Sequence, residues 1–436
     1  MRSKSFISNS GERLSILVDT KGFPLLYPNL FITSMYRNDD QAATSCKKAA
    51  EHLVYFYTVC EGLSIDIERR CETETFLSQE EIQNISGYTG LTQKSALQKL
   101  IINNKENNVS SIKSVNSKRL ETARHTIRIE NEANKVVWQT KYNRLTVFGR
   151  YLDWLQRYHF PYSDNKAKQY FFDERPAKNE GLTFSELHEL LTFKSLNKLH
   201  RNIYLDRIRP EYPENPWNDE GVKCRNYAIA MLLYSCGLRL GELLNVKLED
   251  LISKDGTPYV LIKRNPSDID ETRAKQPSVK TNSRALALTP KLYKIIQEYI
   301  YEHRALLDGV AHCPYLFVSH RKRNNKINPL SISAVEKIFR EFSSIMAFHL
   351  HPHCLRHTWN DRYSESADKR IAKGETTEEK SEMDRCLLMG WAEGSTMSKV
   401  YSSRHNTQRA MEYSLKLQDE DFDLKESLIY DDDVLL

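Results

Sequence analysis

The feature that most constrains the fold is a polar stretch that divides the sequence into two parts with regular hydrophobic spacing. Between Pro161 and Gly181 the chain carries two prolines and several lysines and shows little hydrophobic periodicity. Such a composition is typical of a connection between domains. A chain of 436 residues also exceeds what a single hydrophobic core commonly organises. We therefore expect at least two domains, with an interdomain linker at 161–181.

Hydrophobic spacing in the first part predicts an all-helical domain over 41–160. Apolar residues recur every three to four positions from about Ala42 to Gly62, and again in a long helix that starts near Val136. Ser78 stands directly before three polar residues that favour a first helical turn, so a helix is expected to begin at Gln79.

Less regular segments flank and interrupt this helical domain. Residues 1–40 contain two short β-like runs, 14–18 and 30–33, and are interpreted as an arm or small hairpin. The stretch 103–117 is rich in Asn, Ser and Lys and is expected to be a loop.

The second part, 182–418, is expected to be mostly helical with a small antiparallel β-sheet. The clearest strand-like runs are Tyr259–Lys263 and Ala285–Thr289, which flank a loop. The stretch 209–221 contains three prolines and is interpreted as an insertion. The predicted fold class is therefore mainly α, with a helical N-terminal domain and a mostly α second domain.

Charge is unevenly distributed along the chain. The whole sequence carries +5, but the segment 419–436 holds eight acidic residues and one lysine, which leaves +12 on the preceding 418 residues. A basic body suits a polyanion such as nucleic acid, although an ordinary basic surface would have the same composition. The densest basic run is 320–326, which is expected to be a loop that either reaches phosphates or is an ordinary solvated basic turn. The acidic segment is interpreted as a C-terminal tail that either docks on a neighbouring copy or stays disordered.

The sequence argues against a membrane-spanning or secreted protein and leaves zinc binding as a minor alternative. No apolar run reaches the roughly 18 residues of a membrane helix, and the N-terminus lacks a secretory apolar core, so a cytoplasmic protein is expected. None of the eight cysteines forms a Cys-x-x-Cys pair, which favours reduced thiols. The run from His349 to His357 contains four histidines and one cysteine and raises the alternative of zinc, but its spacing matches no common structural zinc pattern.

The first motif that carries chemistry surrounds Arg239. An apolar helix runs to about Tyr234, breaks at Gly237 and restarts, so Arg239 falls near the first turn of a new helix. Backbone N–H groups at such a turn favour anions. Glu242 follows three residues later on the same helical face and can orient the guanidinium. An ordinary surface ion pair is the alternative interpretation.

Two further motifs complete the pattern. His353 and Arg356 are three residues apart and share one face of a helix, which suits a phosphate whose charge grows during a transfer reaction. The last motif runs from Met389-Gly-Trp391 to Tyr401 and reads as a helix, a turn and a second short helix. Each motif alone has low specificity.

In order and spacing, the three motifs together resemble the tyrosine recombinase (phage integrase) family over about 225–405. The helical domain before them resembles the family's core-binding domain in pattern only. The family also uses a lysine on a β-hairpin between its two arginine motifs. The sequence from Pro277 to Pro290 looks like that hairpin, so Lys280 is the match and Lys275 the competing choice. Trp391 occupies a position that is usually histidine, and its distance to Tyr401 looks one residue longer than is common.

The resemblance implies a site-specific DNA recombinase or integrase that forms a 3′-phosphotyrosyl intermediate without a metal or cofactor. It implies double-stranded DNA sites and four protomers on DNA, with accessory proteins as a possible addition. The uncommon 209–221 stretch and the long N-terminal segment favour a mobile genetic element. Tyr401 would be the nucleophile, and Tyr413 is the alternative. The residues that the resemblance assigns to catalysis are Arg239, Lys280, His353, Arg356, Trp391 and Tyr401.

Two rival functions share much of this pattern. A type IB topoisomerase carries nearly the same catalytic set and relaxes supercoils without exchanging DNA partners. A non-catalytic DNA-binding regulator could have retained the fold, although binding alone would not require all the matching positions.

Overall fold

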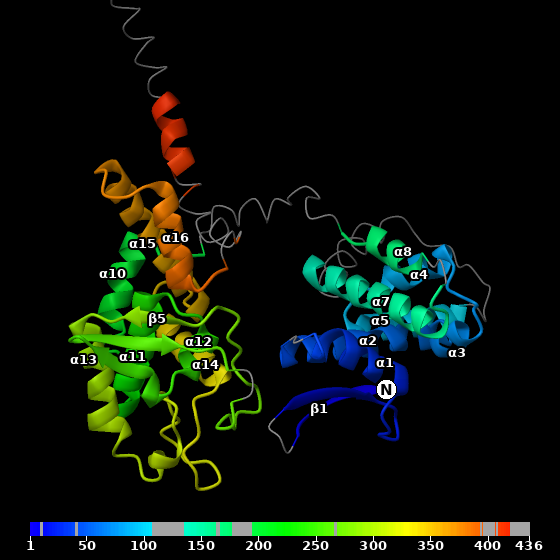
Figure 1. The fold of residues 1–436 in the computed structure, drawn as a ribbon, viewed down its shortest axis with the longest axis horizontal. Coiled ribbons are helices and arrows are strands. Elements are labelled where there is room, and N and C mark those ends of the chain that lie inside the picture. The colour runs from blue at the N-terminus through cyan, green and yellow to red at the C-terminus, as the bar shows by residue number, and fades with distance from the viewer. Residues whose placement is uncertain are drawn as a thin grey trace, which may run out of the picture. The chain divides into compact units, whose positions relative to one another are not determined.

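The computed structural model describes residues 1–8, 12–39, 42–106, 135–162, 166–176, 194–265, 268–392, 395, 406 and 409–418. The chain divides into two compact units, Met1–Leu182 and Thr183–Leu436, which are considered separately (Figure 1). The fold is mainly α, as predicted, with one two-stranded and one three-stranded antiparallel sheet in the described residues. Of the helices that are described, none has the length and apolar character needed to span a bilayer.

The first unit is built around helix α2, which contacts both α5 and α7. Its core is aromatic: Phe56, Phe148 and Tyr151 are fully buried in one cluster, and the Phe56 and Phe148 rings lie 4.6 Å apart. The helices of this unit are α1 (Leu26–Ile32), η1 (Thr33–Arg37), α2 (Ala43–Gly62), α3 (Ile67–Glu72), α4 (Gln79–Tyr88), α5 (Gln93–Glu106), α7 (Trp138–His159) and α8 (Ala167–Asp173).

The predicted helix starts in this unit are confirmed. Helix α4 begins at Gln79 because Ser78 and Glu81 form a capping box, in which each side chain accepts a hydrogen bond from the other residue's backbone N–H. Helix α2 covers 43–62, and α7 begins two residues after Val136. Helix α5 continues to Glu106, into the stretch predicted as a loop, and the rest of that stretch lies outside the described residues.

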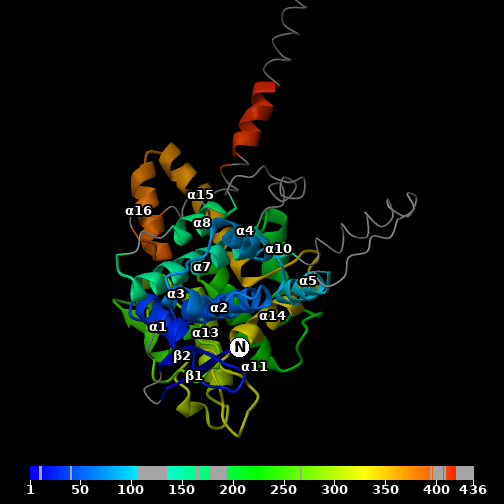
Figure 2. The same cartoon turned by 90° about the vertical axis from the view of Figure 1, so that its right-hand side faces the viewer.

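The N-terminal 40 residues contain a hairpin, but only one of the two predicted strands is correct. Strands β1 (Arg2–Ile7) and β2 (Arg13–Val18) pair antiparallel and lie beside α2 (Figure 2). The run 30–33 is helical instead and belongs to α1 and η1. Phe31 is fully buried in the same cluster as Leu17 of β2. A four-residue apolar run has no periodicity that separates strand from helix, so packing decided its conformation.

The linker prediction for 161–181 is wrong over part of its length. Residues 167–173 form helix α8, and Phe171 is fully buried in the core of the first unit. Its ring lies 6.0 Å from that of Phe148. The lysines of this segment obscured a short helix that buries only one face. Residues 177–193 lie outside the described part of the chain.

The second unit packs its helices around the buried helix α11, which contacts α13, η3 and α15. Ile229, Leu232 and Leu233 of α11 are fully buried. The helices are α10 (Lys198–Arg207), α11 (Glu220–Cys236), α12 (Leu240–Asn245), η2 (Leu248–Asp250), α13 (Pro290–Glu298), η3 (Tyr299–Arg304), η4 (Val310–His312), α14 (Ile332–Ser344), α15 (Pro352–Ala372) and α16 (Glu378–Met389).

The small sheet of this unit has the order β3-β4-β5 and is antiparallel throughout. Its strands are β3 (Leu251–Lys254), β4 (Thr257–Ile262) and β5 (Arg284–Ala287). The two strands predicted from the sequence correspond to β4 and β5, with Tyr259 opposite Ala287. The long connection between them carries Lys280.

Three further segments of this unit were singled out in the sequence: 209–221, 320–326 and the C-terminal residues. The 209–221 stretch is held against the core, because Trp217 packs edge-on against Phe342 with ring centroids 4.9 Å apart. The basic run 320–326 is a loop, as predicted, and it turns through Asn324 and Asn325, which both have positive φ. Residues 409–418 are helical, and the acidic segment 419–436 lies outside the described residues.

Candidate functional site

The site begins where α11 ends. The chain leaves α11 at Gly237, and Arg239 becomes the residue that precedes α12. The Arg239 backbone N–H donates to Glu242 Oε2 at 3.1 Å, and its Nη1 lies 3.4 Å from Oε1 of the same carboxylate. The Arg239 side chain is 23% exposed whereas that of Glu242 is fully buried. The pair is therefore not the ordinary surface ion pair that the sequence left open, because its carboxylate lies inside the protein.

Glu242 is the anchor of a larger cluster. Its Oε1 accepts a hydrogen bond from Thr281 Oγ1 at 2.6 Å, and its Oε2 accepts one from Arg284 Nη2 at 2.8 Å. Arg356 Nη1 lies 3.8 Å from the same Oε2. Burial by itself raises the pKa of Glu242, but Arg284, Arg356 and Thr281 outweigh it and hold the pKa below its ordinary value. Glu242 is therefore ionised at neutral pH.

Arg356 ties three separate segments together from inside the fold. Its side chain is fully buried. Its Nη1 donates to the Gly237 carbonyl at 2.7 Å and its Nη2 to the Met389 carbonyl at 3.3 Å. These contacts connect α15 to the end of α11 and to the end of α16. Arg356 therefore contributes positive charge from below the surface, while Arg239 lies nearer to solvent.

The cluster is rich in positive charge. The three guanidinium groups of Arg239, Arg284 and Arg356 share the single carboxylate of Glu242 in the ion pairs of the described residues. An excess of buried positive charge is costly unless an anion compensates it. The arrangement therefore favours binding of a phosphate group, with Arg239 as the arginine that is exposed enough to meet it.

The Lys280 loop is held against this cluster on two sides. A Cβ on Gly241 of α12 would approach the Ser278 carbonyl oxygen to 2.4 Å, so only glycine allows this contact. On the other side, the Asn282 N–H donates to the Gly390 carbonyl at 2.9 Å. Lys280 is exposed, and it immediately precedes Thr281, which is bound to Glu242.

The competing lysine lies on a different part of the connection. Lys275 is exposed and follows Arg273, whose Nη1 donates to the Leu244 carbonyl at 2.9 Å. Lys280, in contrast, directly precedes a residue that is hydrogen-bonded to Glu242.

His353 lies at the surface in the first turn of α15. Partial burial is the main cause that lowers the pKa of His353, and the positive groups of His351, Arg356 and Arg239 lower it further. Its exposed ring is therefore within range of the arginine charges and is largely neutral at neutral pH. Such an imidazole can accept or donate a proton near a bound phosphate.

The neighbouring histidines have different surroundings. His351 caps α15, because its Nδ1 accepts a hydrogen bond from the Cys354 N–H at 3.2 Å. The ring of His357 is buried and lies 4.7 Å from that of His353. Within the described part of the chain, the His349–His357 run does not bring three ligand atoms close enough for a metal ion.

We expect His357→Asn to make the protein less sensitive to acid. Burial first, and then the positive charge of nearby residues that include His353 and Lys194, lowers the pKa of His357 from 6.5 to about 3. Below pH 6.5 the unfolded chain therefore binds a proton that the folded chain does not. The free energy of unfolding then falls by up to about 1.4 kcal/mol per pH unit.

This prediction can be checked by urea unfolding between about pH 6.5 and 4.5. The variant should show a shallower loss of stability with falling pH than the unmodified protein. The exposed His312 provides a control, since His312→Asn should leave the slope unchanged. Equal slopes in all three proteins would contradict the assignment.

Trp391 packs beneath the cluster. It is 7% exposed and lies with Met389, Trp359 and Cys386 in a small apolar cluster. The Arg356 guanidinium lies 5.7 Å from the centre of its ring. Its backbone N–H donates to the Cys386 carbonyl at 2.9 Å, which fixes the turn after α16. Trp391 thus supports the end of α16 and the position of Arg356.

The structure brings together four of the predicted site residues and places a fifth on the adjoining loop. The first four are Arg239, His353, Arg356 and Trp391, and the fifth is Lys280. Tyr401 lies outside the described residues. Tyr413, the alternative nucleophile, belongs to the helical residues 409–418 and is 64% exposed.

Sequence reasoning missed Thr281 and Arg284. Arg284 Nε donates to the Leu388 carbonyl at 2.7 Å, in addition to the Glu242 contact, and so joins β5 to α16. Both residues lie in the hairpin sequence that drew attention to Lys280. The signal in the sequence was a second basic residue, Arg284, four positions after Lys280.

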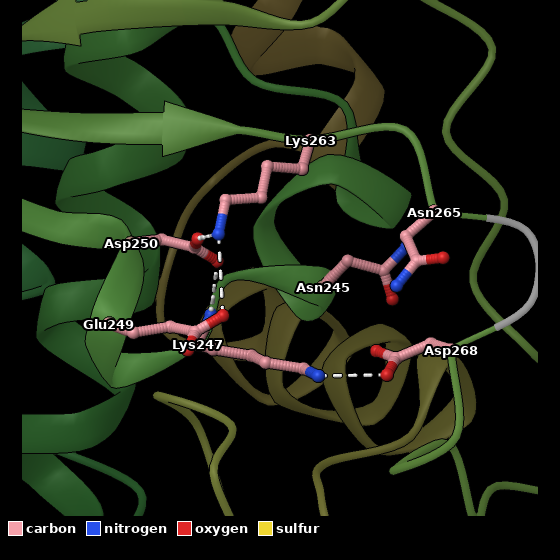
Figure 3. A pocket seen from close by; sticks show the side chains of 7 residues that line it. All are labelled: Asn245, Lys247, Glu249, Asp250, Lys263, Asn265 and Asp268. Carbon is pink, nitrogen blue, oxygen red and sulfur yellow. Dashed lines mark hydrogen bonds and ion pairs between the residues drawn. The ribbon is translucent and has the colours of Figure 1, made fainter.

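A polar hollow of about 100 Å³ lies beyond the other end of α12 (Figure 3). Its two lysines are neutralised: Lys247 lies 2.8 Å from Asp268, and Lys263 lies 2.5 Å from Asp250. Because each ammonium group already has a carboxylate partner, this hollow lacks the excess positive charge of the Glu242 cluster. It offers no comparable anion site.

Comparison with known proteins agrees with this geometry. Residues 214–373 match the Phage integrase family. The chain is 28% identical to tyrosine recombinase XerC of Alcanivorax borkumensis over 174 residues, which cover 40% of this chain and 50% of that protein. It is 30% identical to transposase A from transposon Tn554 of Staphylococcus aureus over 135 residues, which cover 31% of this chain and 34% of that protein.

Among solved structures, XerH site-specific recombinase bound to a palindromic difH substrate aligns with a TM-score of 0.40 and 14% identity, over 85% of this chain and 97% of that one. The family match and the sequence relatives show that the second unit of this chain is similar to tyrosine recombinases of the phage integrase family. The aligned stretch spans half or less of the length of the two sequence relatives named above.

Proposed function

We propose that the protein is a site-specific DNA recombinase that cleaves and rejoins DNA through a covalent 3′-phosphotyrosyl intermediate formed on Tyr401. The observation that carries the proposal is the Glu242 cluster, in which three arginines share one buried carboxylate. Such a cluster suits a phosphodiester, whose negative charge grows as it is attacked. Its components come from the same motifs that match the phage integrase family.

The chemistry follows from the properties of a phenol. A tyrosine hydroxyl has a pKa near 10 and is a weak nucleophile at neutral pH, so its target must be activated. Arg239, assisted by the charge of Arg356, would stabilise the phosphorane-like transition state. His353 would exchange a proton with the attacking oxygen, and Lys280 would protonate the departing 5′-oxygen. The phosphotyrosyl bond conserves the energy of the phosphodiester, so rejoining needs no nucleotide cofactor.

We further propose that the DNA belongs to a mobile genetic element and that four protomers act on two duplexes. The similarity to transposase A from transposon Tn554 supports the first part. The protomer number follows from the family resemblance.

The proposal is tested by covalent capture on a nicked suicide substrate built from the ends of the cognate element. The nick lets the short fragment beyond the cleavage site diffuse away, so rejoining fails and the protein stays attached to DNA. We expect the unmodified protein to form an adduct that survives denaturing electrophoresis and disappears after protease treatment. Absence of any adduct on such ends would reject the enzymatic proposal and leave a DNA-binding regulator.

A plasmid assay separates the recombinase from a type IB topoisomerase. A topoisomerase relaxes any supercoiled plasmid, whereas a recombinase requires its own sites. We expect plasmids without a cognate site to stay supercoiled. Efficient relaxation of such plasmids would favour the topoisomerase.

Lys280→Ala is expected to slow cleavage by about 10²- to 10⁴-fold, the range typical of a lost general acid. Lys275→Ala is the matched control, since Lys275 is also exposed on the same connection between β4 and β5, and it should cleave at the normal rate. The measurement is single-turnover cleavage of the suicide substrate. A substrate with sulfur in place of the bridging 5′-oxygen should restore cleavage by the Lys280 variant, because a thiolate leaves without a proton. Loss of activity in the Lys275 variant instead would reverse the assignment.

A further inference from the structure

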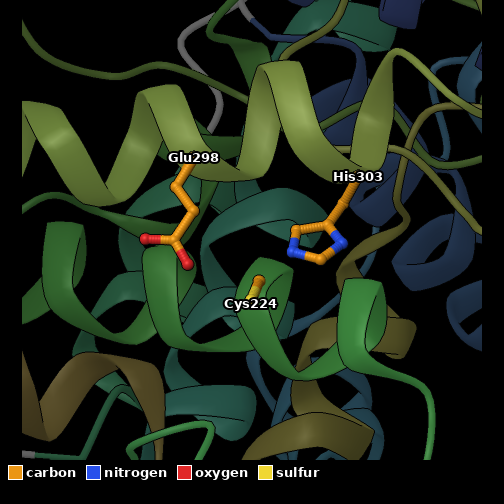
Figure 4. Close-up of side chains that lie close together, drawn as sticks. All are labelled: Cys224, Glu298 and His303. Atoms are coloured by element: carbon orange, nitrogen blue, oxygen red, sulfur yellow. The ribbon is translucent and has the colours of Figure 1, made fainter.

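We propose that the second unit holds a structural divalent metal ion of the zinc type, bound between α11 and the α13–η3 helix by Cys224, Glu298 and His303. One ligand atom from each side chain lies within 4.8 Å of the others. In Figure 4 the Glu298 and His303 side chains point down from one helix toward Cys224 on the other. Thiolate, imidazole and carboxylate are the ligands that zinc takes in proteins, and three of them leave a fourth position for water.

The backbone explains how Glu298 and His303 reach the same side of their helix. They are five positions apart in the sequence, which in a regular α-helix would place them about 140° apart around the axis. The chain instead becomes π-helical at η3, where the Ala305 N–H donates to the Ile300 carbonyl at 2.9 Å. A hydrogen bond between residues five apart widens the turn and aligns positions i and i+5. Such π-turns inside helices are frequent at functional sites.

The surroundings favour a cation and allow it to enter. Cys224 is buried, His303 is half-buried and Glu298 is exposed, so the site opens to solvent on one side. The Glu298 carboxylate lies close to the Cys224 sulfur and contributes negative charge toward a divalent ion, which would replace the thiol proton when it binds.

The proposed metal site is separate from the Glu242 cluster. Cys224 lies in the second turn of α11, and Arg239 follows the opposite end of that helix. Thirteen residues of helix between Cys224 and Gly237 correspond to about 20 Å. The proposed ion would therefore fasten the start of α11 to η3 and stabilise the fold, and the DNA chemistry would still proceed without a metal. This inference does not rest on the proposed function.

The test uses the full-length chain without a histidine tag, stripped of metal with a chelator and titrated with Co²⁺. We expect one equivalent to bind with the visible absorption of tetrahedral cobalt and a thiolate-to-cobalt charge-transfer band. Zinc should displace the cobalt and raise the midpoint of thermal unfolding. Failure of the unmodified protein to develop these bands would overturn the proposal.

Variants assign the ligands. Cys224→Ser should lose the charge-transfer band and the thermal response to zinc. Glu298→Gln and His303→Gln should each weaken cobalt binding by at least about tenfold. Cys313→Ser is the control, because Cys313 is as buried as Cys224 but lies outside the cluster, and it should bind like the unmodified protein. Circular dichroism confirms that each variant is folded, and Glu298 is exposed enough for its substitution to leave the fold intact.

Retention of the charge-transfer band by Cys224→Ser would assign the cobalt to another cysteine and overturn the site. Unchanged cobalt affinity in both Glu298→Gln and His303→Gln would do the same. Covalent capture of DNA by the metal-free protein is measured in parallel. Because that activity does not depend on this ion, its success or failure is independent of the metal result.

Discussion

Tyr401→Phe is expected to abolish covalent capture of DNA while leaving DNA binding intact. Phenylalanine lacks only the hydroxyl oxygen, which is the atom that would form the phosphotyrosyl bond. The arginine cluster and its neighbours lie in other segments of the second unit and keep their contacts. Loss of a nucleophile that acts with a complete set of partners costs more than about 10³-fold in rate. The measurement is adduct yield on the suicide substrate, with binding followed separately by gel shift.

Tyr413→Phe is the control for this experiment. Tyr413 is exposed on the helical residues 409–418, so its substitution should disturb neither the fold nor the site. We expect its adduct yield to equal that of the unmodified protein. An adduct that survives in the Tyr401 variant and is lost in the Tyr413 variant would exchange the two assignments.

The order of the motifs allowed the site to be predicted because each one has a local physical signature. Gly237 ends α11 in the left-handed region, with φ of 60°, so Arg239 necessarily follows a break and starts a new helix. His353 and Arg356 fall on one helix, three residues apart, as the sequence suggests. Their exposure differs, however: Arg356 is fully buried and His353 is exposed. Helical spacing predicts a shared face but not how deep each side chain lies on it.

The contacts that complete the cluster could not be predicted, because they join residues that are distant in sequence. Thr281 and Arg284 reach Glu242 across 39 and 42 residues. No periodicity within a helix or strand reports such a contact. The prediction for 161–181 failed for a related reason, since Phe171 belongs to a core formed mainly by α2 and α7. A short helix is stabilised mainly by the surface on which it packs, and the residues of that surface lie elsewhere in the sequence.

Glu242→Ala is expected to cause a large loss of stability. The variant would leave Arg284 and Arg356 buried without the carboxylate that now neutralises them. Removing one partner of a buried ion pair typically costs about 3–5 kcal/mol. Urea unfolding, followed by tryptophan fluorescence, measures this loss. Glu249→Ala is the control, because Glu249 pairs with Lys263 at 3.3 Å but is 68% exposed, and it should cost less than about 1 kcal/mol.

Glu242→Gln removes the negative charge of this side chain but keeps its size and shape. The amide oxygen can still accept the Thr281 hydroxyl, but it cannot neutralise Arg356. We expect stability between that of the alanine variant and the unmodified protein. The loss of DNA cleavage should be larger than the loss of folded protein, since Arg239 also depends on Glu242 for its orientation. If Glu242→Ala proves no more costly than Glu249→Ala, the arginines are stable without their shared carboxylate. The Glu242 cluster would then lack the costly buried positive charge that favours binding of a phosphate.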